Sequence, residues 1–401
     1  MLFTPERHER LTDQSFSDSG VRGAIARIVS RAESELDRPD GRWRLDDDDR
    51  DFDDEPPASA VYLGAAGIAW ALAELAEEGY CHEIVDRVFV EALEEKIAAD
   101  PDPVEYAANG VWFGPAGVLA VAEHRWPDEA RRNRLFELAH ASLSDPALDI
   151  MFGHPGYMAL AAELHARTGE ERWARLWAEG ADRLFEEWRD ADGIWAWTQR
   201  FGEKDARYVG AAHGLVGNVH VLLRGDDLLE GERRAEVERR AVETLTLLAV
   251  VEDGRANWPP VVGESLVAND DRIRVQWCHG AAGVVATLGR IAQEDEDWGE
   301  LLLAAGRLVW DAGPIRDSPG LCHGTAGNAY ALLALWERTG DEEWLDRARR
   351  FAQHAALQVE DRAARLGRGH HSLFSGDEGV ALCLASCLAG DARFPVADRL
   401  I

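Results

Sequence analysis

The fold is decided by the stretch Gly324-Thr325-Ala326-Gly327-Asn328-Ala329-Tyr330-Ala331-Leu332-Leu333-Ala334-Leu335-Trp336, in which a Gly-x-x-Gly tetrapeptide opens a segment rich in Ala and Leu. Ala and Leu are strong helix formers, and a helix that is apolar on most of its faces must be buried. The tetrapeptides Gly64-Ala65-Ala66-Gly67 and Gly114-Pro115-Ala116-Gly117 open similar segments. The sequence therefore predicts buried helices that begin directly after glycine turns.

The Gly-x-x-Gly tetrapeptide recurs along the chain, which is typical of repeat architectures. A short polar turn and a more amphipathic segment follow the apolar one, as in Thr168-Gly169-Glu170-Glu171-Arg172-Trp173 and Thr339-Gly340-Asp341-Glu342-Glu343-Trp344. The acidic residues suit the first turn of a helix, because the helix dipole favours negative charge at the N-terminus. Each unit is thus predicted to be a helical hairpin with a buried inner helix and a partly exposed outer helix. Seven copies occur, and they begin at Gly64, Gly114, Gly153, Gly214, Gly280, Gly324 and Gly376.

Seven hairpins whose inner helices cannot face water predict an all-α fold, an α/α toroid. Closure into a ring buries the inner helices against one another without capping repeats, and it gathers the glycine turns at one end of the inner barrel. The glycines are expected to permit close approach and positive φ at a crowded axis. We place the toroid at residues 61–401, and we expect residues 1–60 to add a helical extension and an acidic linker to the same domain.

The chain is strongly acidic, with 43 Lys and Arg against 74 Asp and Glu and a formal net charge of −31. This balance argues against nucleic acid as a partner, because a polyanion would be repelled and no basic stripe exists to release its counterions. It indicates adaptation to a salty cytoplasm, where salt screens the self-repulsion of an acidic surface, or else a cationic partner. The acidic run from Asp46 to Glu55 predicts a solvated, mobile linker rather than a cation site, since like charges repel and extend the chain.

No run of apolar residues is long enough to span a membrane, and the charged N-terminus, residues 1–10, lacks the pattern of a signal peptide. We therefore expect a cytoplasmic protein. The five cysteines are an odd number in a long chain and do not predict a disulfide framework. Cys81, Cys383 and Cys387 lie in apolar surroundings. Cys383 and Cys387 are four residues apart and could share a helix face, but they are expected to be buried core thiols.

Three of the seven turns carry chemically active side chains. Two read Trp277-Cys278-His279-Gly280 and Leu321-Cys322-His323-Gly324, and a third reads Ala211-Ala212-His213-Gly214. If equivalent turns converge on the axis of the ring, a thiolate pair and one imidazole meet, which is a tetrahedral Zn²⁺ set with one position open. An open position indicates a catalytic site. Buried cysteines beside helix-capping histidines are the alternative interpretation.

Zinc at such a site would activate a thiol. Only a thiolate is a good nucleophile, and coordination to Zn²⁺ deprotonates a thiol near neutral pH. Two protein thiolates also lower the Lewis acidity of the metal. The predicted site therefore suits holding a reactive thiolate better than hydrolysing water.

The glycine repeat and the three turns resemble the LanC-like proteins, the lanthionine synthetase cyclases and their eukaryotic relatives, from about Tyr62 to Leu388. The chain is more similar to the free-standing eukaryotic-type members than to the bacteriocin cyclases. The most specific stretches are Tyr208-Val209-Gly210-Ala211-Ala212-His213-Gly214-Leu215, Asn257-Trp258-Pro259-Pro260, Trp277-Cys278-His279-Gly280-Ala281-Ala282-Gly283, Gly320-Leu321-Cys322-His323-Gly324 and Ser372-Leu373-Phe374-Ser375-Gly376. The resemblance implies zinc ligands at Cys278, Cys322 and His323.

The resemblance also implies roles for three residues outside the metal set. His213 matches the residue assigned to general acid/base work, and histidine titrates near the pH at which an enolate carbon must be protonated. Asp149 matches an acidic residue placed near the metal that would orient His213, and Arg274 resembles an arginine that stabilises the enolate oxygen. The alternatives are a core histidine for His213, a helix N-cap for Asp149 and a surface ion pair for Arg274.

We therefore expect an enzyme that adds a thiol to a dehydroalanine or dehydrobutyrine residue of a peptide or protein and forms a thioether. The thiol belongs either to the same peptide or to a small molecule. Asp317, just before the second Cys-His-Gly turn, argues against glutathione, because an acidic rim would repel its carboxylates. A metal-free glycoside-processing toroid and a non-catalytic, zinc-containing binding or regulatory protein are the alternatives.

Overall fold

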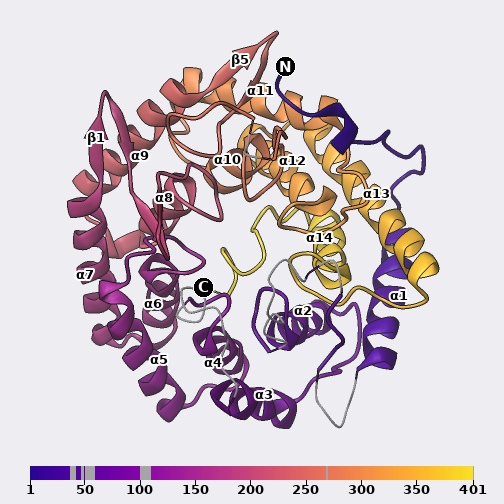
Figure 1. Cartoon of the computed structure of the whole chain (residues 1–401). Helices are drawn as coiled ribbons and strands as arrows, with labels where there is room; N and C mark the ends of the chain where they lie inside the picture. Colours follow the sequence, from indigo (N-terminus) through magenta and orange to yellow (C-terminus); the bar gives the residue numbers. More distant parts are fainter. Residues whose placement is uncertain (37–41, 47–48, 50–58, 100–109, 268–269, 401) are drawn as a thin grey trace.

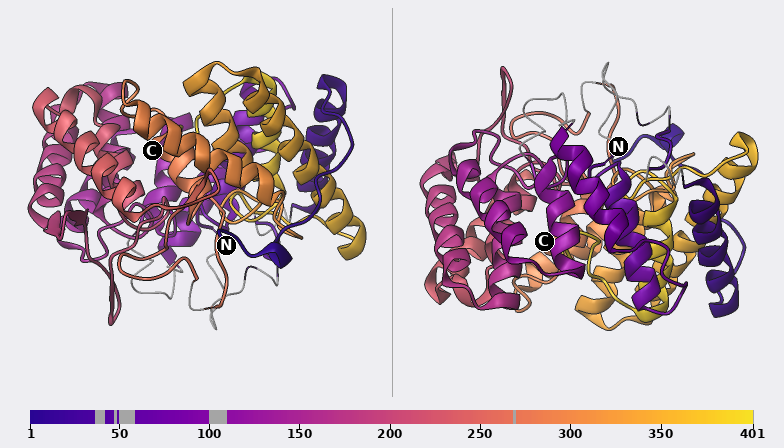
Figure 2. Two further views of the ribbon diagram at one scale, coloured as in Figure 1. Left: turned by 90° about the horizontal axis from the view of Figure 1, so that it is seen from above. Right: turned by 90° about the horizontal axis from the view of Figure 1, so that it is seen from below.

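The computed structural model describes residues 1–36, 42–46, 49, 59–99, 110–267 and 270–400, and in it the chain forms a ring of two concentric layers of α-helices (Figure 1). The edge-on views of Figure 2 show the helices of both layers running between the two faces of the ring. The described inner helices are α2 (Ala65–Glu77), α4 (Pro115–Arg125), α6 (His154–Thr168), α8 (Leu215–Leu223), α10 (Ala281–Leu288), α12 (Thr325–Thr339) and α14 (Asp377–Ala389). The described outer helices are α1 (Asp18–Glu35), α3 (Arg87–Ala99), α5 (Glu129–Ala141), α7 (Glu171–Glu187), α9 (Gly231–Leu248), α11 (Glu296–Ala312) and α13 (Glu342–Leu366). The predicted α/α toroid is confirmed.

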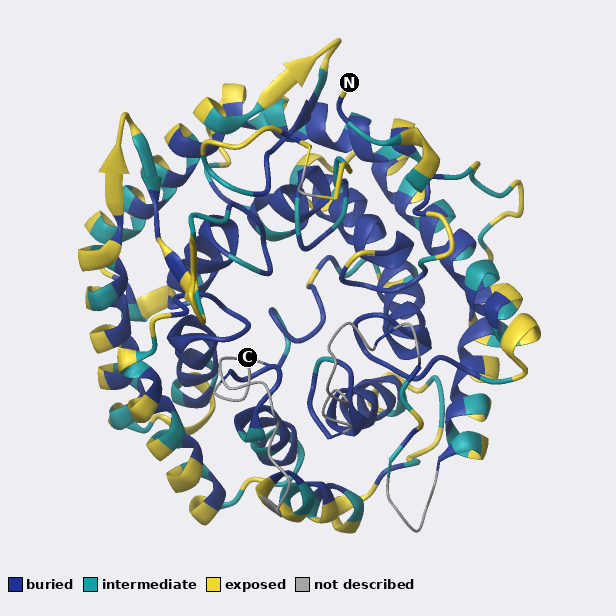
Figure 3. Ribbon diagram, in the orientation of Figure 1, coloured by how far each residue is buried: buried dark blue, intermediate teal, exposed yellow. Residues whose placement is uncertain are grey.

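The two layers differ in burial as their sequences predict (Figure 3). Inner helix α12 is buried at every position from Thr325 to Leu335. Outer helix α7 buries one face, which carries Trp173, Leu176 and Trp177, and exposes the other. Apolar side chains at helical spacing thus let an outer helix cover the inner layer with a single face. None of the described helices is long and apolar enough to cross a membrane.

The first glycine of every Gly-x-x-Gly turn is the N-cap residue of an inner helix, which confirms the predicted position of the turns. The second glycine lies where the helix crosses the chain that leads into its own turn. A Cβ atom at Gly327 would lie 1.9 Å from the carbonyl oxygen of Leu321, and the second glycines of the other turns meet the equivalent carbonyl at 1.9 to 2.4 Å. Close approach is therefore the common reason for the second glycine. Positive φ, which was also expected, occurs among the first glycines only at Gly214 and Gly280.

The seventh hairpin is assembled from the two ends of the chain. In each of the first six units the next described α-helix after the inner helix is its outer partner, whereas α14 packs against both α13 and α1. Helix α1 thereby closes the outer layer between α13 and α3 (Figure 1). The segment before α1 contains the 3-10 helix η1 (Pro5–Arg7), and His8 forms a β-bridge with Ile315. The helical N-terminal segment that the sequence predicts thus supplies the outer helix of the seventh unit.

The described part of the chain also contains three short antiparallel β-hairpins, which the hydrophobic pattern did not indicate and which lie between the helices. They are β1 (Arg189–Ala191) with β2 (Ile194–Ala196), β3 (Gln199–Phe201) with β4 (Lys204–Ala206), and β5 (Val250–Glu252) with β6 (Arg255–Asn257). Two of them turn at Asp-Gly pairs with positive φ, Asp192-Gly193 and Asp253-Gly254. Asp-Gly between short strands is a strong hairpin signal, so these two hairpins were open to prediction. Two further 3-10 helices are η3 (Ser142–Ser144) and η4 (Asp226–Leu228).

The acidic run from Asp46 to Glu55 is not uniformly solvated. Asp46 and Asp49 are buried. Asp46 Oδ2 lies 2.8 Å from Nη1 of Arg368, and Asp49 Oδ2 lies 2.6 Å from Nε2 of His370. The prediction of a solvated linker is wrong at these two positions, because buried partners that can carry positive charge compensate the carboxylates. The other residues of the run lie outside the described part of the chain.

The C-terminal segment enters the centre of the ring (Figure 1). Phe394 stacks on Trp277, with ring centroids 4.4 Å apart. Asp398 forms ion pairs of 3.1, 3.7 and 3.7 Å with three basic side chains, those of His220, Arg224 and Arg290. A cavity that Trp277, Phe394 and Asp398 help to line measures only about 10 Å³, which is about the room that one water needs. The tail therefore fills the axis of the barrel on the side away from the glycine turns.

Candidate active site

The glycine turns meet at one end of the inner barrel, as predicted, because neighbouring turns pack backbone against backbone. A Cβ atom at Gly210 would lie 2.1 Å from the carbonyl oxygen of Cys278. The backbone N–H of Cys278 donates in turn to the carbonyl oxygen of Cys322 over 3.0 Å. Gly320 meets the carbonyl oxygen of Ser375 in the same way, at 2.6 Å. The fourth to seventh turns therefore form one continuous surface.

The thiols of Cys278 and Cys322 form a buried pair. The two residues are 7% and 4% exposed, and the Cys322 thiol donates a hydrogen bond to the Cys278 sulfur. This bond lowers the pKa of Cys278; together with burial, it raises the pKa of Cys322 well above its usual value. Two adjacent buried sulfurs, one of them disposed to carry negative charge, are donors that suit a soft cation such as Zn²⁺.

His323, the third predicted ligand, is not gathered with the sulfurs. It is exposed, its carbonyl oxygen accepts a hydrogen bond from the Ser318 hydroxyl at 3.1 Å, and it lines a cavity of about 250 Å³ with Gln276 and Arg274. Within the described ranges, no three His, Cys, Asp or Glu side chains lie close enough together to hold a metal ion. The structure thus brings two of the predicted ligands together and leaves the third next to Cys322 on the exposed side of the turn.

His213 is held by Asp149. His213 Nδ1 lies 2.7 Å from Asp149 Oδ2, and Asp149 is fully buried. The other carboxylate oxygen of Asp149 accepts hydrogen bonds from the backbone N–H groups of Met151 and Phe152, at 2.9 and 2.8 Å. Asp149 therefore holds its own turn as well as His213. It is not the N-cap of the following helix α6, because that position is Gly153. With Nδ1 engaged, Nε2 is the nitrogen of His213 that is left for proton transfer.

Aromatic rings surround the imidazole of His213. Phe152 stacks on it, with ring centroids 5.0 Å apart, and Phe201 meets it edge-on at 5.4 Å. Phe201 belongs to β3, so the hairpin of β3 and β4 forms a wall of the site. The ring of His279 lies 6.2 Å from that of His213. Burial, together with the charges of His213 and Arg274, lowers the pKa of His279 to about 3, and His279 is therefore neutral near pH 7.

The cavity that His323 lines is locally cationic. Arg7, Arg272 and Arg274 contribute to its wall, and Asp270 is the one carboxylate among the described residues that line it. Burial lowers the pKa of Arg7, and the positive charges of Arg272 and Arg274 lower it further. Arg274 Nη2 lies 3.2 Å from Asp270 Oδ2, so the ion pair that the sequence offered as an alternative is present. A cationic cavity in a chain with a net charge of −31 favours an anionic ligand.

Sequence reasoning missed three residues that the structure places here, namely Arg7, Tyr62 and Gln276. Gln276 Nε2 lies 2.9 Å from the Cys278 sulfur, and the Tyr62 hydroxyl donates a hydrogen bond to the Cys322 sulfur. Gln276 stands two positions before a predicted ligand, and this closeness in sequence was a usable signal. Nothing in the sequence indicates that Arg7 or Tyr62 lies near the second Cys-His-Gly turn.

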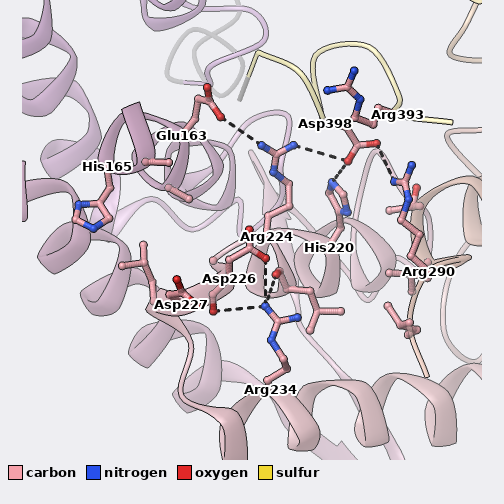
Figure 4. Close-up of a pocket in the computed structure, with 18 of the residues that line it drawn as sticks. Glu163, His165, His220, Arg224, Asp226, Asp227, Arg234, Arg290, Arg393 and Asp398 are labelled. Carbon is pink, nitrogen blue, oxygen red and sulfur yellow. Dashed lines mark hydrogen bonds and ion pairs between the residues drawn. The ribbon is translucent and has the colours of Figure 1, made fainter. Parts of the chain in front are cut away.

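A larger cavity, of about 900 Å³, lies at the opposite end of the barrel. Figure 4 shows the side chains that line it. Its walls are the C-terminal ends of α6, α8 and α10 and the C-terminal tail. Its charged side chains pair with one another: Arg224 lies 3.8 Å from Glu163, and Arg234 lies 3.5 Å from Asp226. Because the tail fills the axis between this cavity and the thiol pair, the cavity is separate from the candidate site.

Known proteins resemble this chain in sequence and in fold. A family model described as lanthionine synthetase C-like protein matches residues 55–398. The chain is 28% identical over 311 residues to the Glutathione S-transferase LANCL1 of Danio rerio, which covers 70% of this chain and 72% of that protein. It is 32% identical over 203 residues to the LanC-like protein GCL1 of Arabidopsis thaliana, covering 47% of this chain and 43% of that protein. Among solved structures, nisin cyclase superposes with a TM-score of 0.63 at 16% identity, over 90% of this chain and 93% of that one, a likeness of fold.

Proposed function

Because the chain belongs to the lanthionine synthetase C-like family, we propose that it is a zinc-dependent enzyme that adds a thiol to a dehydroalanine or dehydrobutyrine residue of a peptide or protein. One observation carries the proposal: the Cys278 and Cys322 thiols lie at the same end of the barrel as the pair of His213 and Asp149. The addition needs an activated thiol and a proton donor. The site offers side chains for both tasks.

Cys278, Cys322 and His323 are the residues that would hold the zinc ion. Zinc, when bound, supplies the deprotonation of a substrate thiol near neutral pH. Burial of the two sulfurs favours this role, because the attraction between a thiolate and a cation is stronger where the local dielectric is low. His323 would add its imidazole from the position that follows Cys322.

His213 would supply the proton that completes the addition. Attack of the thiolate sulfur on the β-carbon forms the C–S bond, and the electron pair of the C=C bond moves toward the amide carbonyl. The α-carbon then takes a proton from Nε2 of His213, since Nδ1 is engaged with Asp149. The Asp149 carboxylate stabilises the protonated imidazole before the transfer. Arg274, in the wall of the neighbouring cavity, would stabilise the charge on the carbonyl oxygen.

The cationic cavity favours a thiol that carries carboxylates. Arg7, Arg272 and Arg274 offer guanidinium groups that suit such anions. Asp317, on which the argument against glutathione was based, does not line the cavity; its side chain is 70% exposed and lies 3.8 Å from Arg365. That argument therefore loses its basis. The relative from Danio rerio is named a glutathione S-transferase, and a carboxylate-bearing small thiol of this class is the substrate we propose.

The proposal is tested with the full chain, loaded with zinc, and a peptide that contains dehydroalanine. The peptide is incubated with glutathione, γ-glutamylcysteine or cysteine, and mass spectrometry measures the thioether adduct. We expect the wild type to form the adduct and His213→Ala to form it about 10²–10⁴-fold more slowly. His82→Ala, which changes an exposed histidine on the outside of the ring, is the control. A peptide left unmodified with all three thiols would refute the addition chemistry.

The same experiment separates this function from its alternatives. A glycoside-processing enzyme would not depend on zinc, whereas the proposed addition is lost when a chelator removes the metal. A non-catalytic binding protein would keep its zinc, and its function would not be impaired by His213→Ala.

A second variant tests the class of thiol. Arg7→Gln removes one positive charge from the cavity, and we expect the KM for glutathione to rise about tenfold, which corresponds to one charge-assisted hydrogen bond. The KM for cysteine should change less. Arg10→Gln, on the same N-terminal segment but exposed, is the control. An unchanged KM for glutathione would argue against a carboxylate-bearing thiol and leave the addition chemistry standing.

A further inference from the structure

Each of the two sulfurs has a hydrogen-bond donor that is not a cysteine. Gln276 Nε2 lies 2.9 Å from the sulfur of Cys278. Tyr62 adjoins Cys322 through Phe374: its ring stacks on that of Phe374, and the carbonyl oxygen of Phe374 accepts a hydrogen bond from the backbone N–H of Cys322 over 2.9 Å. From this place the hydroxyl of Tyr62 donates to the sulfur of Cys322. The donors come from segments far apart in the sequence, since Tyr62 precedes the first inner helix and Gln276 belongs to the fifth turn. Both sulfurs are therefore braced from outside the pair.

The amide of Gln276 is held in place by its own turn. The backbone N–H of Gln276 donates to the carbonyl oxygen of His279 over 3.1 Å, which closes the turn around Cys278. The next hydrogen bond, from the backbone N–H of Cys278 to the carbonyl oxygen of Cys322, ties this turn to its neighbour. The side-chain amide thus points at the sulfur from a rigid base.

Tyr62 is held by the second and seventh turns. Its ring stacks on Phe374, with centroids 4.9 Å apart and an interplanar angle of 12°, and lies 4.8 Å from the ring of Phe113. Its backbone N–H donates to the carbonyl oxygen of Trp112 over 3.0 Å, and its carbonyl oxygen accepts from the Ser372 hydroxyl at 3.4 Å. Contacts with the second and seventh turns therefore fix the phenol, and its hydroxyl reaches the sixth.

We propose that Tyr62 and Gln276 are positioning residues that hold the sulfurs of Cys322 and Cys278 in the arrangement that binds zinc. The inference rests on the proposed function. Two thiolates and a substrate thiolate would bring three negative charges into a site where the protein sulfurs are 7% and 4% exposed. Donated hydrogen bonds replace part of the lost solvation of such charges, and the partners of metal ligands orient them as well.

The inference is tested by metal affinity and by spectroscopy, independently of turnover. The variants are Tyr62→Phe and Gln276→Leu, which remove the donors and keep most of the side-chain volume. Zinc affinity is measured by competition with a chelator, and the cobalt-substituted protein reports the sulfur-to-metal charge-transfer band. We expect each variant to bind zinc about 10–100-fold more weakly and to shift that band.

Tyr330→Phe is the matched control. It removes a phenol hydroxyl from another inner-barrel tyrosine, one whose partner is Ser386 Oγ at 2.9 Å, so it costs a buried hydrogen bond that does not involve Cys278 or Cys322. Its zinc affinity and charge-transfer band should equal those of the wild type. If Tyr62→Phe does not fold, as judged by its thermal melting curve, the zinc affinity and charge-transfer band of Gln276→Leu decide whether the inference holds.

Two results would overturn the inference, and they differ in what else they overturn. Wild-type affinity and an unshifted band in both variants would show that the two donors do not position the sulfurs, while the proposed function would stand. A wild type that takes up neither zinc nor cobalt would overturn the inference and the zinc-dependent function together.

Discussion

His213 and Asp149 are hydrogen-bonded over 2.7 Å although 64 residues separate them in the sequence. The carboxylate cannot turn away, because its second oxygen accepts two backbone hydrogen bonds within its own turn. The third turn of the barrel therefore sets the orientation of the imidazole on the fourth. This relationship makes Asp149 a sensitive position for testing the role of His213.

Asp149→Asn keeps the shape of the side chain and removes its charge. We expect kcat for adduct formation to fall about 10²–10⁴-fold, because the protonated imidazole loses its charged partner. Zinc content and thermal melting, measured alongside the rate, show whether the site and the fold persist. Asp182→Asn, in an ion pair with Arg233 on the outer helices, should leave kcat unchanged. A normal kcat in Asp149→Asn would mean that the carboxylate serves only its own turn.

Gly327→Ala tests the close approach within the glycine turns. The added Cβ atom would lie 1.9 Å from the carbonyl oxygen of Leu321, so the backbone must shift, and we expect a loss of at least about 1–3 kcal/mol in the free energy of unfolding. Gly231→Ala is the control, because it adds a Cβ atom in the first turn of α9 with nothing within 4 Å. Chemical denaturation measures both. Equal stability of the two variants would contradict the packing argument.

His371→Gln tests the junction of the chain ends at α1 and α14. His371 Nδ1 lies 2.7 Å from Glu378 and Nε2 lies 3.1 Å from Glu35. Burial would lower the pKa of His371, but the charges of Glu378, Asp377 and Glu35 outweigh it and raise the pKa to about 9. Because the unfolded pKa is about 6.5, the stabilisation is fully present below that pH and is lost as the pH rises through about 9.

The variant should therefore be less stable than the wild type by about 2–3 kcal/mol near pH 6. Near pH 10 the difference should be small. Denaturant titrations at both pH values measure it, with the exposed His82→Gln as the reference. A difference that grows with pH would show that His371 is not protonated in the folded protein.

Phe394→Ala tests whether the C-terminal tail supports the thiol pair. Its ring stacks on Trp277, the residue before Cys278. We expect a loss of about 3–5 kcal/mol and a faster reaction of the buried cysteines with a thiol reagent under native conditions. Phe351→Ala, in the outer helix α13, removes an equally buried ring away from the turns. Similar rates for both variants would show that the tail contributes stability alone.

The repeat and its helices follow from local sequence signals. Ala-rich and Leu-rich segments, a glycine N-cap before each inner helix and one apolar face on each outer helix are properties of short stretches. The interactions that form them are made between residues close together in the sequence. The adjacency of Cys278 and Cys322 follows as well, because equivalent positions of neighbouring units become neighbours once the ring closes.

Tertiary structure alone decided which distant segments complete the site and the ring. The sequence did not indicate where three parts of the molecule lie in the fold. These are the phenol of Tyr62, the guanidinium of Arg7 and the α1 helix that completes the seventh unit. The burial of Asp46 and the exposed place of His323 depend in the same way on what surrounds them. Hydrogen bonds and ion pairs act over a few ångströms, so they are set by how distant segments pack, whereas helices and turns are set by the residues that form them.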